Sequence, residues 1–161
     1  MADTYTQIYI QIVFAVKGRG NLISEPIRDE LQKYFTGMIH DKGHRVLAIY
    51  CMPDHTHILV RFSPDCNFSE FVKSIKSATT RFINDRGWFR GHFSWQNGFG
   101  AFSYSNSQVD QVINYILNQP AHHKKSTFRD EYLAFLEKFQ ISFNEKYLFD
   151  FYENDEPNPT E

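Results

Sequence analysis

Apolar residues along this chain recur at two spacings, one typical of β-strands and the other of α-helices. Ile, Val, Phe and Tyr dominate residues 5–16, which predicts a central strand. From 24 to 43 the apolar residues instead lie three or four positions apart, after a Ser suited to a helix N-cap and a Pro suited to the first turn. Two further apolar segments, 45–52 and 55–62, flank a Pro-Asp turn and are predicted to pair as a hairpin.

A second amphipathic helix is predicted to begin at Asn67 or Ser69 and to end before Gly87. The segment Phe93-Ser94-Trp95 follows it as the candidate fourth strand. The resulting order of strand, helix, strand, strand, helix and strand matches the split βαβ plan. The hydrophobic pattern therefore predicts an α+β fold of the ferredoxin-like class, built on an antiparallel sheet.

The part of the chain after the predicted fourth strand is expected to be helical. Residues 98–101 have the composition of a flexible linker, and Ser105-Asn106-Ser107 offers N-caps for a third helix over 108–118. Pro120 is expected to stop that helix, because proline lacks the backbone N–H that a helix interior needs. A further helix is predicted over 128–139, with its aromatic residues and leucines packed inward.

Length and composition indicate one folded domain. A chain of 161 residues with 42% hydrophobic residues can form one core but is short for two. We assign residues 1–144 to this domain and predict that the acidic segment 145–161 is a flexible tail. No apolar run is long enough to span a membrane. The N-terminus lacks signal-peptide features and the chain has only two cysteines, so a reduced cytoplasmic protein is expected.

Charge is unevenly distributed over the sequence. The formal net charge of −2 does not by itself indicate a nucleic-acid partner, but acidic residues gather in the tail and leave the remainder mildly basic. Basic residues after the first strand and along the second helix are candidate contacts to DNA phosphates. An ordinary solvated helix face is the alternative for the helical set. The candidates are Lys17, Arg19, Lys73, Lys76, Arg81, Arg86 and Arg90.

Two histidines, His55 and His57, stand on either side of Thr56 at the start of the predicted third strand. Because side chains alternate between the faces of a strand, both imidazoles are expected on one face and Thr56 on the other. Two neighbouring neutral imidazoles form half of a metal site. Paired histidines at a strand end also serve local hydrogen bonding, so the pair alone leaves both interpretations open.

On the predicted third helix, Tyr115 and Gln119 lie four residues apart and therefore on one face. Two imidazoles and a glutamine oxygen would leave room for phosphate oxygens around a divalent ion, and such oxygen ligands favour Mg²⁺ or Mn²⁺. The ion would neutralise charge on a phosphodiester while the Tyr115 phenolate attacks phosphorus. If Tyr115 is considered alone, the alternative interpretation is an aromatic residue packed in the hydrophobic core.

Three ordered segments then carry a family resemblance: residues 52–60 (MPDHTHILV), residues 95–103 (WQNGFGAFS), and residues 108–123, which hold Asn114-Tyr115-Ile116 and Asn118-Gln119. Over residues 5–139 the chain resembles the single-tyrosine HUH transposases of small bacterial insertion sequences. The resemblance implies a ferredoxin-like sheet with helices on one face and a mobile C-terminal helix that carries the tyrosine. It also implies that single-stranded DNA with hairpin ends is cut through a 5′-phosphotyrosine with the help of a divalent metal.

The resemblance assigns roles to individual residues. His55 and His57 resemble the paired metal ligands, Gln119 the third ligand and Tyr115 the nucleophile. Thr56 departs from the bulky apolar residue that the family usually has between the histidines, and a small packing cost is expected. The resemblance further implies a homodimer whose tyrosine helix completes either its own subunit's site or the partner's, and the sequence leaves that choice open.

The sequence leaves three alternative functions open. A domesticated relative would act with the same chemistry on repeated palindromes of its host genome. A ferredoxin-like module that binds single-stranded nucleic acid without cutting it is possible for the same fold. A Zn²⁺ hydrolase would have His122 or His123 as the third ligand.

Overall fold

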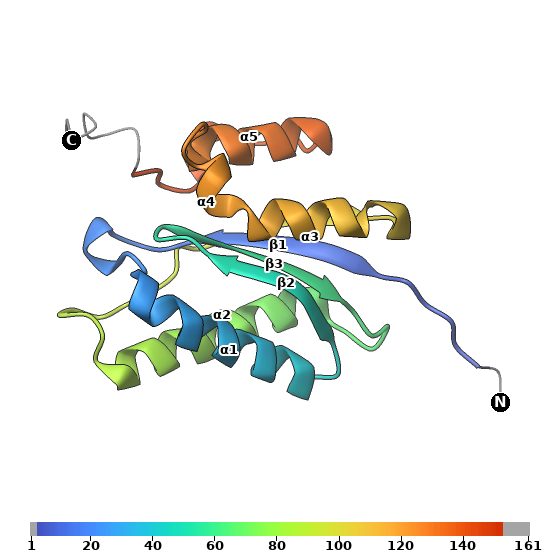
Figure 1. Ribbon diagram of the computed structural model, residues 1–161, viewed down its shortest axis with the longest axis horizontal. Coiled ribbons are helices and arrows are strands. Elements are labelled where there is room, and N and C mark those ends of the chain that lie inside the picture. Colours follow the sequence, from blue (N-terminus) through green and yellow to red (C-terminus); the bar gives the residue numbers. More distant parts are fainter. Residues whose placement is uncertain (1–2, 153–161) are drawn as a thin grey trace.

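The strands of the structure form one antiparallel sheet, and helices cover both of its faces (Figure 1). The computed structural model describes residues 3–152. In chain order the elements are β1 (Tyr9–Ala15), α1 (Glu25–Asp41), β2 (Arg45–Cys51), β3 (His55–Arg61), α2 (Phe68–Arg86), β4 (Gly100–Tyr104), α3 (Val109–Leu117), α4 (Gln119–His122) and α5 (Phe128–Lys138), with short 3₁₀ turns at Arg19–Asn21, Asn106–Gln108 and Glu145–Tyr147.

The sheet has the strand order β2-β3-β1-β4, with every neighbouring pair antiparallel. This order and the helices between the strands confirm the predicted α+β, ferredoxin-like plan. Helices α1 and α2 lie on one face, whereas α3, α4 and α5 lie on the other (Figure 1). Among the described residues, no helix is long and apolar enough to cross a membrane.

Strand β3 lies inside the sheet and is buried on both of its faces. Because its side chains alternate, Ile58 and Val60 join the large core with α1 and α2, while Leu59 packs with Val112 and Ile116 of α3. The large core is rich in aromatic rings, and Phe14 of β1 meets the edge of Trp95 at a centroid distance of 4.8 Å in its interior.

The fourth strand lies elsewhere than predicted. Phe93-Ser94-Trp95 is not a strand, and Trp95 makes only an isolated bridge to Val16, because Phe93 and Trp95 are buried in the aromatic core. Strand β4 instead starts within the predicted linker, at Gly100, and pairs with β1. Its buried Phe102 stacks on Phe135 of α5 at 4.9 Å. Two glycines in the linker conceal this strand pattern in the sequence.

Gly100 is needed at its position because α5 comes very close to β4 there. A Cβ atom on Gly100 would lie 2.8 Å from both Cε1 and the hydroxyl oxygen of Tyr132. Such contacts are too short for carbon, so any side chain here would force the ring of Tyr132 to shift.

The C-terminal segment also differs from the prediction of a flexible tail beginning at residue 145. Phe149 is buried and packs 4.9 Å from Tyr132. The backbone N–H of Asp150 donates to Gln96 Oε1 at 2.7 Å, and Gly18 N–H donates to the Tyr152 hydroxyl at 2.7 Å. The rest of the predicted tail, 153–161, lies outside the described residues.

Lys76 of α2, one of the candidate phosphate contacts, is held by the fold. Its ammonium donates to the carbonyl oxygens of Gln96 at 2.7 Å and Gly98 at 2.8 Å, and lies over the ring of Phe14. Burial lowers the pKa of Lys76 to about 8. The lysine therefore ties α2 to the loop before β4.

We expect Lys76→Met to lower the free energy of unfolding by about 1–3 kcal/mol, because two carbonyls lose a charged donor. The exposed Lys73 on the same helix is the matched control, and Lys73→Met should stay within about 0.5 kcal/mol of the wild type. Urea unfolding of both variants measures the difference, and equal stabilities would contradict the structural role of Lys76.

We expect Gly100→Ala to destabilise the protein by about 1–3 kcal/mol, since the added methyl group overlaps Tyr132. Gly91 has open space around its Cα and serves as the control. Thermal unfolding should show a lower midpoint for Gly100→Ala than for Gly91→Ala, and the reverse order would argue against the close packing of α5 on β4.

Candidate active site

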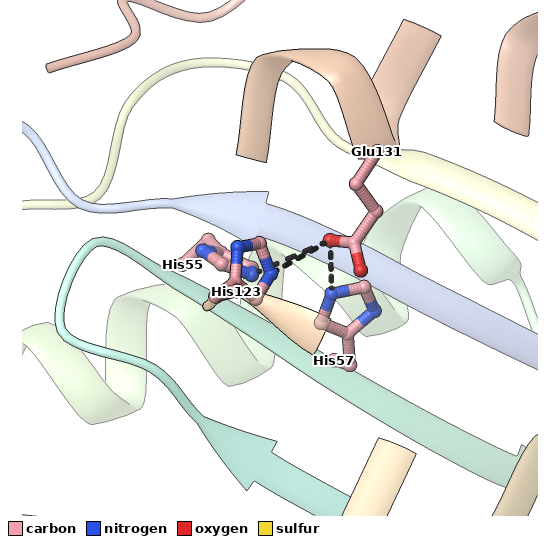
Figure 2. A group of neighbouring side chains, drawn as sticks. All are labelled: His55, His57, His123 and Glu131. Carbon is pink, nitrogen blue, oxygen red and sulfur yellow. Dashed lines mark hydrogen bonds and ion pairs between the residues drawn. The ribbon is translucent and has the colours of Figure 1, made fainter. Parts of the chain in front are cut away.

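His55 and His57 project from the same face of β3, toward α3, α4 and α5 (Figure 2). Both side chains are fully buried, and their ring centroids lie 5.0 Å apart. The alternation of the strand sends Thr56 to the opposite face, where it is also buried and pairs with Cys51 across the β2–β3 hairpin.

Neighbouring side chains fix how the two rings are turned. His55 Nδ1 lies 2.7 Å from Asp54 Oδ1, and the ring stacks on Phe128 at 3.8 Å. His57 Nδ1 lies 2.7 Å from Gln11 Oε1 of β1. An amide oxygen only accepts hydrogen bonds, so this contact assigns the proton of His57 to Nδ1. Both rings therefore present Nε2 to the same space between the sheet and the helices.

The helical segment 109–123 delivers three side chains to that space, spaced four residues apart. Gln119, which is fully buried at the start of α4, places Oε1 3.3 Å from His55 Nε2 and 2.9 Å from His123 Nε2. Tyr115 of α3 lies beside them, its ring stacked on His122 at 4.4 Å. Pro120 ends α3 near the predicted position, but a further turn, α4, follows and keeps His123 on the same side.

Glu131 of α5 lies at the centre of the group. Its carboxylate oxygen Oε1 is 2.9 Å from His57 Nε2, 3.3 Å from His123 Nε2 and 3.5 Å from His55 Nε2 (Figure 2). The other oxygen, Oε2, accepts hydrogen bonds from Gln119 Nε2 at 2.9 Å and from the Tyr115 hydroxyl. Only 7% of this residue is exposed.

The charges in the group act on one another. Burial alone would raise the pKa of Glu131, but the surrounding imidazoles, His57 first, outweigh it and hold that pKa well below its usual range. Burial opposes a charge on His55, yet Asp54 and Glu131 together raise the pKa of His55 to about 9. Burial lowers the pKa of His57. For Tyr115, burial and then the Glu131 charge raise the pKa, so its hydroxyl stays protonated without a nearby cation.

The donor atoms of the group fit a divalent cation. The nitrogens of His55, His57 and His123 and a carboxylate oxygen of Glu131 all lie within 4.8 Å of one another. Three imidazoles and one carboxylate are a donor set that proteins use for divalent metals. The four residues could thus hold such an ion.

The sequence-derived candidates for the chemical centre meet in one chain, since Tyr115, Gln119, His55 and His57 all adjoin the same space. From the sequence, His123 was one of two possible third ligands of the alternative hydrolase, beside His122. Glu131 was missed altogether. Its signal is a carboxylate in the apolar stripe of a helix, three residues after Phe128 and four residues before Phe135.

The candidate phosphate contacts do not all gather at this site. Helix α2, which carries or precedes most of them, lies on the opposite face of the sheet from α3, the helix that contains Tyr115 (Figure 1). Lys73, Arg81 and Arg90 are exposed there, and Arg86 pairs with Glu30 at 3.5 Å. Exposed Lys17 and Arg19 follow β1. Arg19 lines a cavity of about 450 Å³ that also reaches Asp54 and His123 at the histidine cluster.

A second cavity, of about 500 Å³, opens beside Tyr115 between α3 and α5. Glu131 and His122 line its inner part, and the exposed Lys125 and Lys138 contribute to its wall. The tyrosine is therefore accessible from a space large enough for part of a nucleotide, with positive charge nearby.

Known proteins share both the sequence pattern and the fold. The family described as IS200-like transposases matches residues 4–119. The transposase TnpA of ISDra2 from Deinococcus radiodurans is 24% identical over 120 residues, which are 70% of this chain and 84% of that protein. A crystal structure described as that of a transposase from Deinococcus radiodurans R1 superposes with a TM-score of 0.58 and 22% identity, over 74% of this chain and 95% of that one. The structure of a REP-associated tyrosine transposase bound to a REP hairpin also gives a TM-score of 0.58, with 17% identity over 76% and 73% of the two chains.

Proposed function

The chain belongs to the IS200-like transposase family, and from this we propose that it cleaves and rejoins single-stranded DNA through a 5′-phosphotyrosine intermediate. The observation that carries the proposal is that the Tyr115 hydroxyl donates to Glu131, whose carboxylate also contacts the buried His55 and His57 and accepts from Gln119. A core tyrosine would need no such set of polar groups around its hydroxyl.

Tyr115 is the proposed nucleophile. Its oxygen forms a bond to phosphorus while the bond from phosphorus to the 3′-oxygen of the preceding nucleotide breaks. The phenol loses its proton and the departing 3′-oxygen gains one, so the cut strand ends in a free hydroxyl. Because the phosphotyrosine conserves the energy of the broken bond, the reverse step with another 3′-hydroxyl rejoins DNA without ATP.

His55, His57 and Gln119 are the proposed ligands of a divalent metal, with Mg²⁺ or Mn²⁺ as the expected ion. When bound, such an ion neutralises charge on the phosphate and favours ionisation of a nearby phenol. Asp54 and Gln11 orient the two histidine rings through Nδ1, which is the usual role of residues behind metal ligands.

Hairpin-bearing single-stranded DNA is the proposed substrate. The similarity to a transposase solved with a REP hairpin supports this substrate class. Among the candidate contacts, Arg19 is placed best to meet a strand at the site, because its cavity adjoins His123. A homodimer and a cytoplasmic location stay predictions, and assembly of the site within one subunit is proposed because one chain supplies all of its residues.

The same similarity favours a second candidate with identical chemistry, a domesticated transposase that acts on repeated palindromes of its host. The genome distinguishes the two. A mobile element occurs in several copies, each flanked by matching hairpin ends, whereas a domesticated gene stands alone among scattered palindromes.

We expect wild-type protein, incubated with Mn²⁺ and a labelled hairpin strand from the DNA around its gene, to form an adduct that survives SDS. Tyr115→Phe should form at least about 10⁴-fold less, because the attacking oxygen is gone. Tyr147→Phe, which changes an exposed tyrosine, is the control and should react as wild type does. An undiminished adduct in Tyr115→Phe would exclude Tyr115 as the nucleophile.

Metal removal separates cleavage from binding. With EDTA we expect strand scission to stop while hairpin binding changes less than about threefold, because phosphate contacts to basic residues do not need the ion. Gel analysis of cleavage and a mobility shift on the same samples measure both, and added Mn²⁺ should restore scission. Tight binding with no scission under any metal condition would instead favour the non-catalytic binding module.

A further inference from the structure

We propose that Glu131 joins the tyrosine to the metal: one carboxylate oxygen, together with His123, completes the metal site of His55 and His57, and the other oxygen holds the Tyr115 hydroxyl. The inference deepens the proposed function and rests on it for the role of Tyr115. Both added residues lie beyond position 119, where the match to the transposase family ends.

The first step is the convergence of donors. Three imidazole nitrogens, each the Nε2 atom, lie 2.9–3.5 Å from the same oxygen of Glu131. For His123, the described residues offer no hydrogen-bond partner to the buried Nδ1, so the contacts of Nε2 orient the ring. His123 thus faces the site in the same way as the two strand histidines.

The second step is the separate use of the two carboxylate oxygens. Oε1 faces the imidazoles, whereas Oε2 accepts from Gln119 and from the Tyr115 hydroxyl. A carboxylate that binds a metal through one oxygen keeps the other free to accept a hydrogen bond. Glu131 can therefore fix the distance between the nucleophile and the ion, which is the form of catalysis that positioning provides.

The third step is the cost of burying this carboxylate. Glu131 is 7% exposed, and a buried negative charge needs positive charge or several donors close by. Helix α5 nevertheless places it inward. Asp130 N–H is capped by Thr127 Oγ1 at 3.1 Å, and Tyr132 and Phe135 pack the helix against β4. The capping and packing of α5 thus hold one carboxylate among three histidines.

The resulting donor set bears on the choice of ion. Adding His123 and Glu131 to His55, His57 and Gln119 raises the number of imidazole ligands from two to three, so the site contains more nitrogen. Mg²⁺ prefers oxygen ligands, whereas Mn²⁺ accepts imidazole more readily. The proposal therefore predicts at least about tenfold tighter binding of Mn²⁺ than of Mg²⁺.

The decisive experiment is calorimetric titration of Mn²⁺ into the full chain without DNA. Glu131→Gln keeps the shape of the side chain and removes its charge, and should raise the Kd for Mn²⁺ by about 10–100-fold. Glu137→Gln makes the same change at an exposed position of α5 and should bind as wild type does. Wild-type affinity in a folded Glu131→Gln protein, checked by circular dichroism, would remove Glu131 from the ligand set.

A measurement that does not depend on the folding of Glu131→Gln tests the His123 half of the added ligand set. Pulsed electron paramagnetic resonance of bound Mn²⁺ should detect nitrogen coupling from three imidazoles, and His123→Gln should reduce the count to two. Coupling from two imidazoles in the wild type would overturn the role of His123.

The proposed hold of Glu131 on the Tyr115 hydroxyl is tested with DNA at saturating Mn²⁺. Glu131→Gln should then form the covalent adduct at least about tenfold more slowly than wild type, and Glu137→Gln at the wild-type rate. An equal rate for Glu131→Gln would refute the link to Tyr115. Absence of adduct in the wild type would refute the proposed function, while the titration without DNA would still decide the metal ligands.

Discussion

Burial of β3 on both faces is the constraint from which the rest of the structure follows. Its alternation divides the molecule into an aromatic core on the side of α1 and α2 and a polar centre on the side of α3, α4 and α5. Pairing with β1 sets which residues lie beside the histidines, and Gln11 is thereby available to His57. A slip of one residue would turn both imidazoles into the aromatic core. Burial of polar rings there is unfavourable, so the observed register of this strand is strongly favoured.

The polar centre is costly to build and gains its stability from mutual neutralisation. A carboxylate, three imidazoles, a carboxamide and a phenol meet between the sheet and the helices, and the most deeply buried of them would be unfavourable there alone. The contacts to Glu131 offset part of that cost, although Nδ1 of His123 has no hydrogen-bond partner among the described residues. Such a group is sensitive to any change of charge, and this is a common property of sites that bind cations and phosphates.

Strong local signals in the sequence predicted most of the fold. The helix bounds at Glu25–Asp41 and Phe68–Arg86 followed from caps and apolar spacing, and the hairpin followed from its Pro-Asp turn. Strand β4 was missed because its glycine is required by a residue of α5, 32 positions away in the sequence, and no local pattern shows such a contact. For the same reason the packing of Phe149 against Tyr132 was not foreseen.

For the candidate site, too, local patterns predicted some residues, whereas tertiary contacts decided the others. His55 and His57, and likewise Tyr115 and Gln119, were predictable because each pair lies within one element, where the period of a strand or helix fixes their common face. Glu131 reaches the site only through the packing of α5 on the sheet, which depends on tertiary contacts. In the sequence it is one of many acidic residues on helices, and only its place in an apolar stripe distinguishes it.

The close approach of α5 to β4 at Gly100 connects this packing with the candidate site. Tyr132, whose ring rests against Gly100, is the chain neighbour of Glu131, so a Cβ atom at position 100 would press on the residue next to the carboxylate. Position 100 has no functional group and touches no ligand atom of the cluster. Natural selection for the chemistry would nevertheless act on it, as a spacer whose value lies in its lack of a side chain.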